Sequence, residues 1–257
     1  MTKFIFIYVL GLIFFFSITT KVLSEENKTI FLNEVSQLPI HVSIPNDLKA
    51  NLIAIIGGKG LKNKHGKSKN FLKRNKSTFV KGGLAFFLFP NFSYNEKASY
   101  KLRRSSERAK RILSLVKYIK TQNDKPIFLI GFSRGSIDVG VFSLKYPSTI
   151  NGVIIASGIY DNKSKKAKNF SMEKIIGNSN NVKTLIVHHK LDTCRVTKYE
   201  KAILFFNNLN SPDKTFLNYL EGNPSGRECG PYHYHGYEGI ETQVTKDITS
   251  WILSKVN

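Results

Sequence analysis

The feature that most constrains this chain is the segment Gly131-Phe132-Ser133-Arg134-Gly135, which follows an apolar run and precedes a helical pattern. A G-x-S-x-G segment between a strand and a helix is typical of a nucleophile elbow, a sharp turn that holds its serine in a strained backbone conformation. Strand and helix pass closest two residues before and two residues after the serine, and glycine suits both positions because it has no side chain. The segment therefore predicts a nucleophilic serine at the end of a buried strand.

Along the rest of the chain, buried strands alternate with helices. Continuous apolar runs indicate strands covered on both faces, and apolar residues at helical spacing indicate amphipathic helices. Such alternation predicts an α/β fold with a mostly parallel central sheet and helices on both faces. A polar, lysine-rich insertion at 161–181 is the candidate cap, so the cap is expected to be small or absent. The expected strands are 29–35, 40–44, 52–56, 84–89, 127–130, 153–156, 184–188 and 215–220, and the expected helices are 99–122, 133–144, 199–207 and 240–252.

Residues 1–24 read as a secretory signal peptide. Lys3 precedes the apolar block 4–16, and more polar residues then lead to the small side chain of Ser24, after which we expect cleavage. Residues 25–257 are expected to form one α/β domain of a secreted or periplasmic protein, because single domains of this fold class often reach this length. An uncleaved membrane anchor is the alternative, although the apolar block is shorter than the roughly 20 residues that span a bilayer.

The chain is strongly basic, with 39 Lys and Arg against 18 Asp and Glu. Such a surface could attract nucleic acid, anionic lipid or an acidic polymer. The densest basic stretch, residues 59–76, contains few aromatic side chains and matches no nucleic-acid-binding motif, so specific nucleic-acid recognition is not expected. A solvated loop is the favoured interpretation of this stretch.

A serine nucleophile needs a general base, and the base needs a carboxylate that orients it, because a neutral hydroxyl is a weak nucleophile. Asp192 follows the strand that ends at residue 188, and His235 lies in the loop before the last helix. In an α/β fold such loops meet at the C-terminal edge of the sheet. The chain order Ser133, Asp192, His235 matches the order expected for this triad. His233 is the competing base and Asp161 the fallback acid.

The chain contains two cysteines, Cys194 and Cys229. Paired thiols close in an oxidising compartment, so export predicts a disulfide between them, and two free buried thiols are the alternative. Cys194 lies two residues after Asp192, and Cys229 lies six residues before His235. A bridge would therefore fix the relative position of the two loops that carry the proposed acid and base.

These motifs resemble those of the α/β-hydrolase superfamily, and the resemblance covers essentially the whole region after residue 24. It implies the fold and a serine hydrolase activity, but it implies no particular substrate. The narrower resemblance is to a little-characterised branch of exported bacterial α/β hydrolases. It rests on three motifs: Gly131-Phe132-Ser133-Arg134-Gly135-Ser136, His188-His189-x-x-Asp192-x-Cys194, and Cys229 followed by His235-Gly236-Tyr237-x-Gly239-Ile240-Glu241.

The resemblance also implies an oxyanion hole, in which two backbone N–H groups bind the negative charge that develops on the substrate. One donor would be the N–H of Arg134, directly after the nucleophile and at the positive end of its helix. The second would be the N–H of Lys59 or of Gly58, in a glycine-rich turn that stands in place of the superfamily's His-Gly-x-Gly turn. Gly57 replaces the histidine of many relatives, which leaves the register of the second donor open. A plain tight turn is the alternative.

The sequence therefore predicts a secreted or periplasmic, esterase-like serine hydrolase that cleaves a carboxylic ester or related acyl bond through an acyl-enzyme intermediate. No metal or other cofactor is expected. The expected partner is a small-molecule ester or acyl substrate, and an anionic acyl group is one interpretation, because the basic stretch after Lys59 begins beside the proposed oxyanion hole. The mature protein is expected to be a monomer without stable membrane insertion.

Two other functions fit some of the same residues. His188, His189, His233 and His235 could form a zinc site with Asp192, because two loops would then supply nitrogen and oxygen ligands. A hydrolase fold that only binds its ligand is the other alternative. The zinc interpretation leaves the G-x-S-x-G segment unexplained, so the serine hydrolase is preferred.

Overall fold

The computed structural model describes residues 25–161, 164 and 167–256. The expected signal peptide, residues 1–24, and its cleavage after Ser24 lie outside the described residues. Within those described ranges, none of the helices is both long enough and apolar enough to cross a bilayer.

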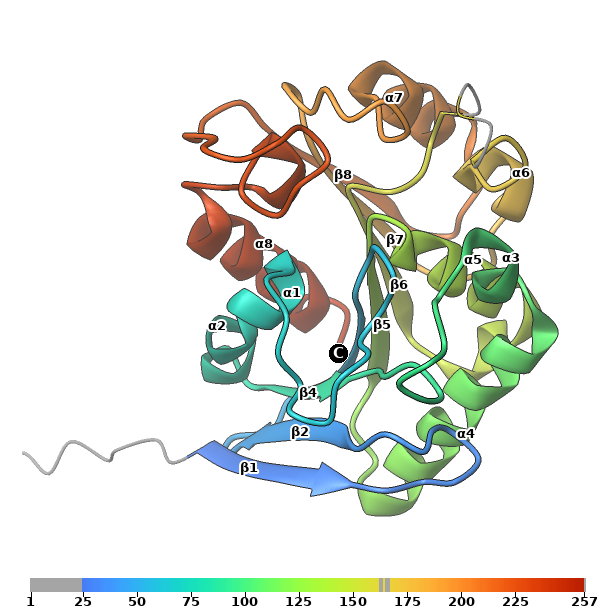
Figure 1. The fold of residues 1–257 in the computed structure, drawn as a ribbon, viewed down its shortest axis with the longest axis vertical. Helices are drawn as coiled ribbons and strands as arrows, with labels where there is room; N and C mark the ends of the chain where they lie inside the picture. Colours follow the sequence, from blue (N-terminus) through green and yellow to red (C-terminus); the bar gives the residue numbers. More distant parts are fainter. Residues whose placement is uncertain (1–24, 162–163, 165–166, 257) are drawn as a thin grey trace, which may run out of the picture.

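A mixed β-sheet forms the centre of the molecule (Figure 1), and in the described chain it has eight strands in the order β1-β2-β4-β3-β5-β6-β7-β8. β2 pairs antiparallel with both β1 and β4, and all the other neighbours pair in parallel. The expected mostly parallel sheet is confirmed. The strands are β1 (Glu25–Ile30), β2 (Ile40–Pro45), β3 (Ala50–Ile55), β4 (Leu84–Leu88), β5 (Ile127–Phe132), β6 (Gly152–Ala156), β7 (Thr184–His189) and β8 (Lys214–Tyr219).

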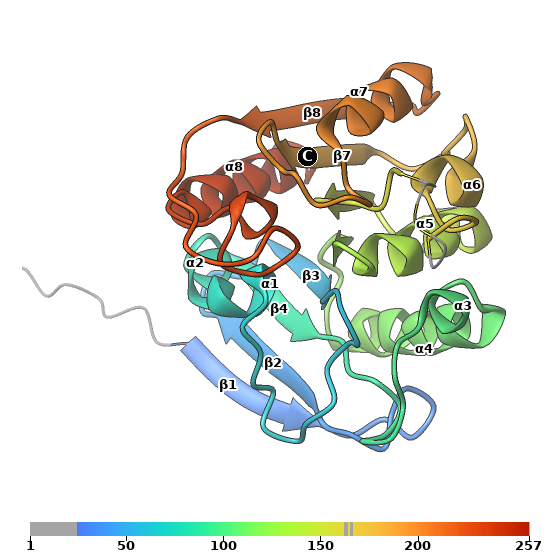
Figure 2. The same ribbon diagram turned by 45° about the horizontal axis from the view of Figure 1, so that its top comes forward.

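Helices cover both faces of the sheet, as expected. Alternate side chains of a strand point to opposite faces, and in β3 Leu52 and Ala54 join one apolar cluster whereas Ile53 and Ile55 join the other. The first cluster includes residues of α1, α2 and α8, and the second includes residues of α4, α5, α6 and α7. Figure 2 shows α1, α2 and α8 on one side of the sheet and α4, α5 and α6 on the other. The helices are α1 (Phe71–Arg74), α2 (Lys76–Lys81), α3 (Tyr100–Arg103), α4 (Ser106–Gln122), α5 (Gly135–Lys145), α6 (Met172–Ile176), α7 (Tyr199–Asn208) and α8 (Glu241–Leu253), with single 3-10 turns at Pro147–Thr149 and Tyr234–Gly236.

The first strand differs from the expectation. β1 ends at Ile30, and the apolar residues that suggested a strand over 29–35 lie partly in a turn, where the N–H groups of Val35 and Ser36 both donate to the Leu32 carbonyl (2.8 and 2.9 Å). β1 lies at the edge of the sheet, and its side chains are mostly exposed. An exposed edge strand has no continuous apolar run, so the pattern that reveals buried strands misses it.

The basic stretch 59–76 is not wholly a solvated loop. Its last residues form α1 and the start of α2, and two of its cations bind carboxylates. Arg74 lies 2.7 Å from Glu241 of α8, and Lys76 lies 2.7 Å from Glu25 of β1. These ion pairs attach the end of the stretch to two distant parts of the chain.

The single helix expected over 99–122 is divided into α3 and α4. α3 ends at Arg103, and Ser105 is the N-cap of α4, because its Oγ accepts a hydrogen bond from the Arg108 N–H (3.2 Å). Serine is favoured at this position because its side chain satisfies one of the unpaired N–H groups of the first turn.

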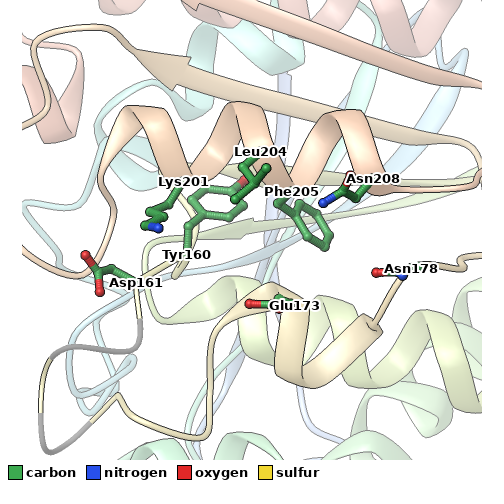
Figure 3. A pocket seen from close by; sticks show the side chains of 8 residues that line it. All are labelled: Tyr160, Asp161, Glu173, Asn178, Lys201, Leu204, Phe205 and Asn208. Carbon is green, nitrogen blue, oxygen red and sulfur yellow. The ribbon is translucent and has the colours of Figure 1, made fainter.

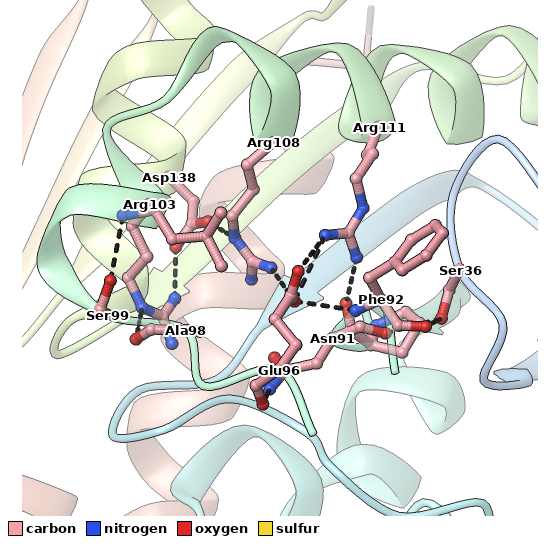
Figure 4. A network of polar contacts seen from close by, with 12 residues as sticks. Ser36, Asn91, Phe92, Glu96, Ala98, Ser99, Arg103, Arg108, Arg111 and Asp138 are labelled. Atoms are coloured by element: carbon pink, nitrogen blue, oxygen red, sulfur yellow. Dashed lines mark hydrogen bonds and ion pairs between the residues drawn. The ribbon is translucent and has the colours of Figure 1, made fainter. Parts of the chain in front are cut away.

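Three arginines of α3 and α4 are buried in a network with two carboxylates (Figure 4). Arg103 and Arg108 both donate to Asp138 of α5, and all three side chains are buried. Arg111 of α4 lies 3.0 Å from Glu96. The network therefore joins α3, α4 and α5 on one face of the sheet.

Arg103 also fixes the loop that follows β3. Its Nη2 donates to the Ile56 carbonyl (2.9 Å) and its Nε donates to the Ala98 carbonyl (3.2 Å). Nearby, Asn91 Nδ2 donates to the Lys59 carbonyl (2.9 Å). A buried donor without an acceptor is costly, so these bonds hold the loop in one position.

We expect Asp138→Asn to lower the free energy of unfolding by about 3–5 kcal/mol, because it leaves the buried Arg103 without a carboxylate and leaves Arg108 with Glu96 alone, 3.6 Å away. Urea unfolding of the purified protein measures this loss. Glu26→Gln is the control, because Glu26 forms an exposed ion pair with Lys28 (3.2 Å), whose removal should cost less than about 1 kcal/mol. Equal losses in the two variants would contradict a structural role for the buried network.

Candidate active site

Ser133 lies at the sharp turn between β5 and α5, with a backbone φ of 54°. A positive φ is strained for a residue with a side chain and persists only where the surrounding structure enforces it. The Ser133 N–H donates to the Ala156 carbonyl at 2.9 Å, which holds the turn against the end of β6. The local geometry is the strand, turn and helix of the predicted nucleophile elbow.

The glycines around Ser133 are explained by close backbone contacts. A Cβ at Gly131 would overlap the Gly135 carbonyl, and a Cβ at Gly135 would overlap the Ile55 carbonyl. A Cβ at Gly57 would lie 2.8 Å from the Ser133 Cβ. The loop after β3 therefore passes directly against the serine, and this contact leaves no room for a side chain at position 57.

The backbone of the turn at 57–60 passes beside Ser133. Gly58, at φ 59°, lines the same cavity as Ser133 and Arg134, whereas Lys59 is not among the described residues that line it. Within the described chain, no acceptor pairs with the N–H of Gly58 or of Arg134. Of the two candidates for the second oxyanion donor, Gly58 is the one that lines the cavity.

Asp192 and His235 are in direct contact, with Oδ2 and Nδ1 2.9 Å apart. Asp192 also accepts hydrogen bonds from the Cys194 N–H (2.9 Å) and the Thr197 hydroxyl (2.8 Å). Burial raises the pKa of Asp192, but His235, with smaller contributions from His188 and the Cys194 N–H, outweighs burial and lowers that pKa below its usual value. An ionised carboxylate only accepts hydrogen bonds, so Nδ1 of neutral His235 carries the proton and Nε2 is free to take one.

His235 lies beside the elbow. Its ring centroid is 5.1 Å from that of Phe132, the residue before Ser133. The His235 carbonyl accepts a hydrogen bond from the Ser157 hydroxyl (2.9 Å), and Ser157 directly follows Ala156, the acceptor for the Ser133 N–H. The nucleophile and base candidates are therefore attached to consecutive residues at the end of β6.

The residues after His235 fix its loop to the sheet. A Cβ at Gly236 would overlap the Pro231 carbonyl, so the loop folds closely on itself. Tyr237 adopts φ 58°, and its buried hydroxyl donates to the Val187 carbonyl of β7 (2.9 Å). Gly236 and Tyr237, which follow His235 in the sequence, thus hold its loop in place: the glycine allows the close turn and the tyrosine attaches the loop to β7.

The competing acid and base have other surroundings. Asp161 lines a cavity of about 220 Å³ with Tyr160 and Phe205, between α6 and α7 (Figure 3). The His233 ring lies against Tyr234, with centroids 5.2 Å apart. Neither Asp161 nor His233 takes part in the contact between Asp192 and His235.

His188 is buried at the end of β7, and its Nε2 lies 3.9 Å from Asp192 Oδ2, which is longer than a hydrogen bond. Its ring stacks on Tyr199 (centroids 5.9 Å apart) and meets Tyr160 edge to face (5.6 Å). Burial lowers the pKa of His188 to about 4, so this side chain is neutral at pH 7. It therefore does not compete with His235 for the charge of Asp192.

The four histidines of the zinc alternative do not form one metal shell. In the described chain, the one group of three potential ligands consists of Asp192, Cys194 and His235, whose ligand atoms lie within 4.8 Å of one another. The Cys194 sulfur is in a disulfide and offers no thiolate. His189 is bound elsewhere, with its Nε2 2.7 Å from the Glu221 carbonyl. The donor set therefore does not favour zinc.

The predicted disulfide is present between Cys194 and Cys229. It joins the loop that carries Asp192 to the loop that carries His235, and both cysteines line the cavity beside Ser133. The crosslink was predictable from the sequence, but the contacts of Thr197 and Ser157, whose hydroxyls position the acid and the base, were not. Neither Thr197 nor Ser157 belongs to a sequence motif that indicates such a contact.

The cavity beside Ser133 has a volume of about 670 Å³. This volume is within the range of small-molecule sites. Its described lining includes Gly58, Tyr100, Arg134 and the disulfide. The arrangement can therefore bring a small molecule against Ser133 and against two residues, Gly58 and Arg134, whose N–H groups have no acceptor among the described residues.

The sequence matches no protein-family model and no curated protein. Solved structures are similar: a dienelactone hydrolase from Anabaena variabilis (14% identity, 91% of this chain and 99% of that chain, TM-score 0.60), Est1E from Butyrivibrio proteoclasticus (15%, 90% and 98%, 0.62) and an esterase from Pyrococcus furiosus (12%, 91% and 92%, 0.62). The narrower resemblance to an exported branch stays a prediction. The similarity over nearly the whole length of these three structures establishes that this chain has the α/β-hydrolase fold.

Proposed function

We propose that the protein is an esterase-like serine hydrolase in which Ser133 is the nucleophile, His235 the general base and Asp192 the residue that orients the base. The observation that best supports this proposal is the 2.9 Å Asp192–His235 contact, located beside a serine in a strained turn. Solved structures of the same fold bear the names of esterases, lipases and a dienelactone hydrolase, which favours an ester bond as the target.

In the first half of the reaction, His235 Nε2 takes the proton from the Ser133 hydroxyl as Oγ attacks the acyl carbon. The carbonyl π electrons move to the oxygen, and the N–H groups of Arg134 and Gly58 bind this oxyanion. The tetrahedral intermediate then expels the alcohol, which receives the proton from His235. The products of this half are the free alcohol and an acyl ester on Ser133.

In the second half, water replaces the serine hydroxyl as the attacking group. His235 takes a proton from the water, the oxyanion forms in the same place, and Ser133 leaves with the proton that His235 returns. Asp192 stays ionised throughout and stabilises the imidazolium that forms twice in each cycle. Thr197 donates to Asp192 Oδ2 (2.8 Å) and so positions the carboxylate.

We also propose that the protein works outside the cytoplasm. The disulfide supports an oxidising compartment, because structural disulfides are rare where glutathione keeps thiols reduced. The expected signal peptide points to the same compartment.

We expect Ser133→Ala and His235→Ala each to lower kcat/KM for p-nitrophenyl butyrate by at least about a thousandfold, because each removes a group that forms or transfers bonds in the reaction. Release of p-nitrophenol measures the rate, and circular dichroism checks that each variant is folded. His65→Ala is the control, because His65 is exposed on the basic stretch. Wild-type activity in Ser133→Ala would refute the proposed mechanism.

We expect Cys194→Ser combined with Cys229→Ser to lower the free energy of unfolding by about 3–4 kcal/mol, because the crosslink closes a loop with a sequence separation of 35 residues. The kcat/KM should also fall, because the loops of Asp192 and His235 lose their covalent link. Urea unfolding and the ester assay measure the two effects. Treatment of the wild type with a reductant should reproduce both, and unchanged kcat/KM would show that the crosslink does not position the site.

A further inference from the structure

We propose that the cavity beside Ser133 binds an ester that carries a carboxylate, and that Arg134, Arg195 and Arg227 hold this carboxylate. The inference rests on the proposed function and narrows its substrate class. All three arginines line the cavity that Ser133 lines.

The choice of arginine over lysine is not explained by composition. The chain contains 31 lysines and 8 arginines, yet every described cation that lines this cavity is an arginine. Four of the other arginines bind carboxylates inside the fold: Arg74, Arg103, Arg108 and Arg111. Half of the arginines thus bind a carboxylate within the described chain, whereas only four of the 31 lysines do so there: Lys28, Lys49, Lys76 and Lys255.

The covalent structure brings two of the three arginines to the cavity. Arg195 directly follows Cys194, and Arg227 lies two residues before Cys229, so the disulfide holds both at the same opening. Arg195 and Arg227 are both exposed. Their positions depend on a crosslink that also joins the loops of the proposed acid and base.

The third arginine is held by an aromatic ring. The Arg134 guanidinium lies 4.7 Å from the centroid of the Tyr100 ring. A cation above a ring face is stabilised by the ring, while its N–H donors stay free for another partner. Arg134 also directly follows Ser133, so its side chain is anchored next to the reacting group.

In the part of the chain that the structure describes, none of the three guanidinium groups forms an ion pair. Among residues 25–161, 164 and 167–256, no carboxylate oxygen lies within 4.0 Å of Arg134, Arg195 or Arg227. Glu228 is the single acidic residue in the described lining. Three like charges around one cavity, in a chain with formal net charge +21, repel one another and attract an anion.

A carboxylate fits this arrangement better than a neutral polar group. The planar guanidinium fork matches the two oxygens of a carboxylate, and such charge-assisted pairs are stronger than neutral hydrogen bonds. The sequence suggested an anionic substrate from the basic stretch after Lys59, but Lys59 is not among the described residues that line the cavity. The three arginines of the cavity, not the basic stretch, are therefore the reason to expect an anionic substrate.

The test compares two esters of the same shape, 4-acetoxybenzoate and 4-acetoxybenzamide, which differ in one negative charge. Isothermal titration of Ser133→Ala measures binding without turnover. We expect the benzoate to bind at least tenfold more tightly than the benzamide, with a preference that weakens as salt is added. Equal dissociation constants would overturn the inference.

A matched pair of double variants, each made in the Ser133→Ala background, separates the cavity from the general charge. Arg195→Gln with Arg227→Gln removes two cavity cations, and Lys120→Gln with Lys246→Gln removes two exposed cations of α4 and α8. We expect the preference for the benzoate to fall at least fivefold in the arginine variant and to stay at its original value in the lysine variant. An equal fall in both would assign the preference to net charge and overturn the inference.

Two further outcomes keep this inference distinct from the proposed function. If the wild-type enzyme hydrolyses both esters with equal kcat/KM, the serine hydrolase stands and the carboxylate site fails. If Ser133→Ala binds the benzoate preferentially but the wild type hydrolyses neither ester, the anion site stands and the hydrolase fails. Tighter binding of 4-acetoxyphenyl phosphate than of the benzoate would assign the cavity to phosphate and overturn the choice of carboxylate.

Discussion

The close backbone contact around Ser133 is the constraint on which the rest of the site depends. The ends of β3 and β5 and the start of α5 approach so closely that positions 57, 131 and 135 have no room for a Cβ. This contact maintains the positive φ of Ser133, whose strain is on the order of 1–3 kcal/mol. It also sets the distance between the serine and the loop of Gly58. A larger side chain at any of the three glycines would separate elements that must act together.

Much of the fold could be predicted from the sequence, because its main signals are local. Buried parallel strands are continuous apolar runs, and an elbow is five consecutive residues, so both can be recognised without knowing the partner segments. The buried arginines could not be recognised in this way. Arg103 and Arg108 look like surface cations of a helix until Asp138, some 30 residues away, is placed between them. Ser157 was missed for the same reason, because its partner His235 is 78 residues away. Thr197 is only five residues from Asp192, but the identity of a single threonine does not indicate which side chain it contacts. The choice between Gly58 and Lys59 depends on the rotation of one turn, which residue types do not determine.

The molecule uses its cations in two ways. Lysines are spread along the chain and account for most of the formal net charge, whereas arginines concentrate at defined positions in the core and at the cavity. In the core, Arg103 connects Asp138 to the Ile56 carbonyl, one residue before the glycine turn. An ion pair that stabilises the fold thus also sets the position of a backbone donor beside Ser133. Stability and the geometry of the proposed active site are therefore coupled through one side chain.

The bond between Cys194 and Cys229 has a consequence for the outer edge of the sheet. The chain between the two cysteines contains α7 and β8, and β8 is the last strand on its side. Edge strands fray first and are the strands that neighbouring molecules can capture. Here both flanks of the edge strand are joined covalently, so β8 cannot detach as a free arm and insert into a second copy of the protein. The crosslink thus restrains the outer edge of the sheet, and its two cysteines also line the cavity beside Ser133.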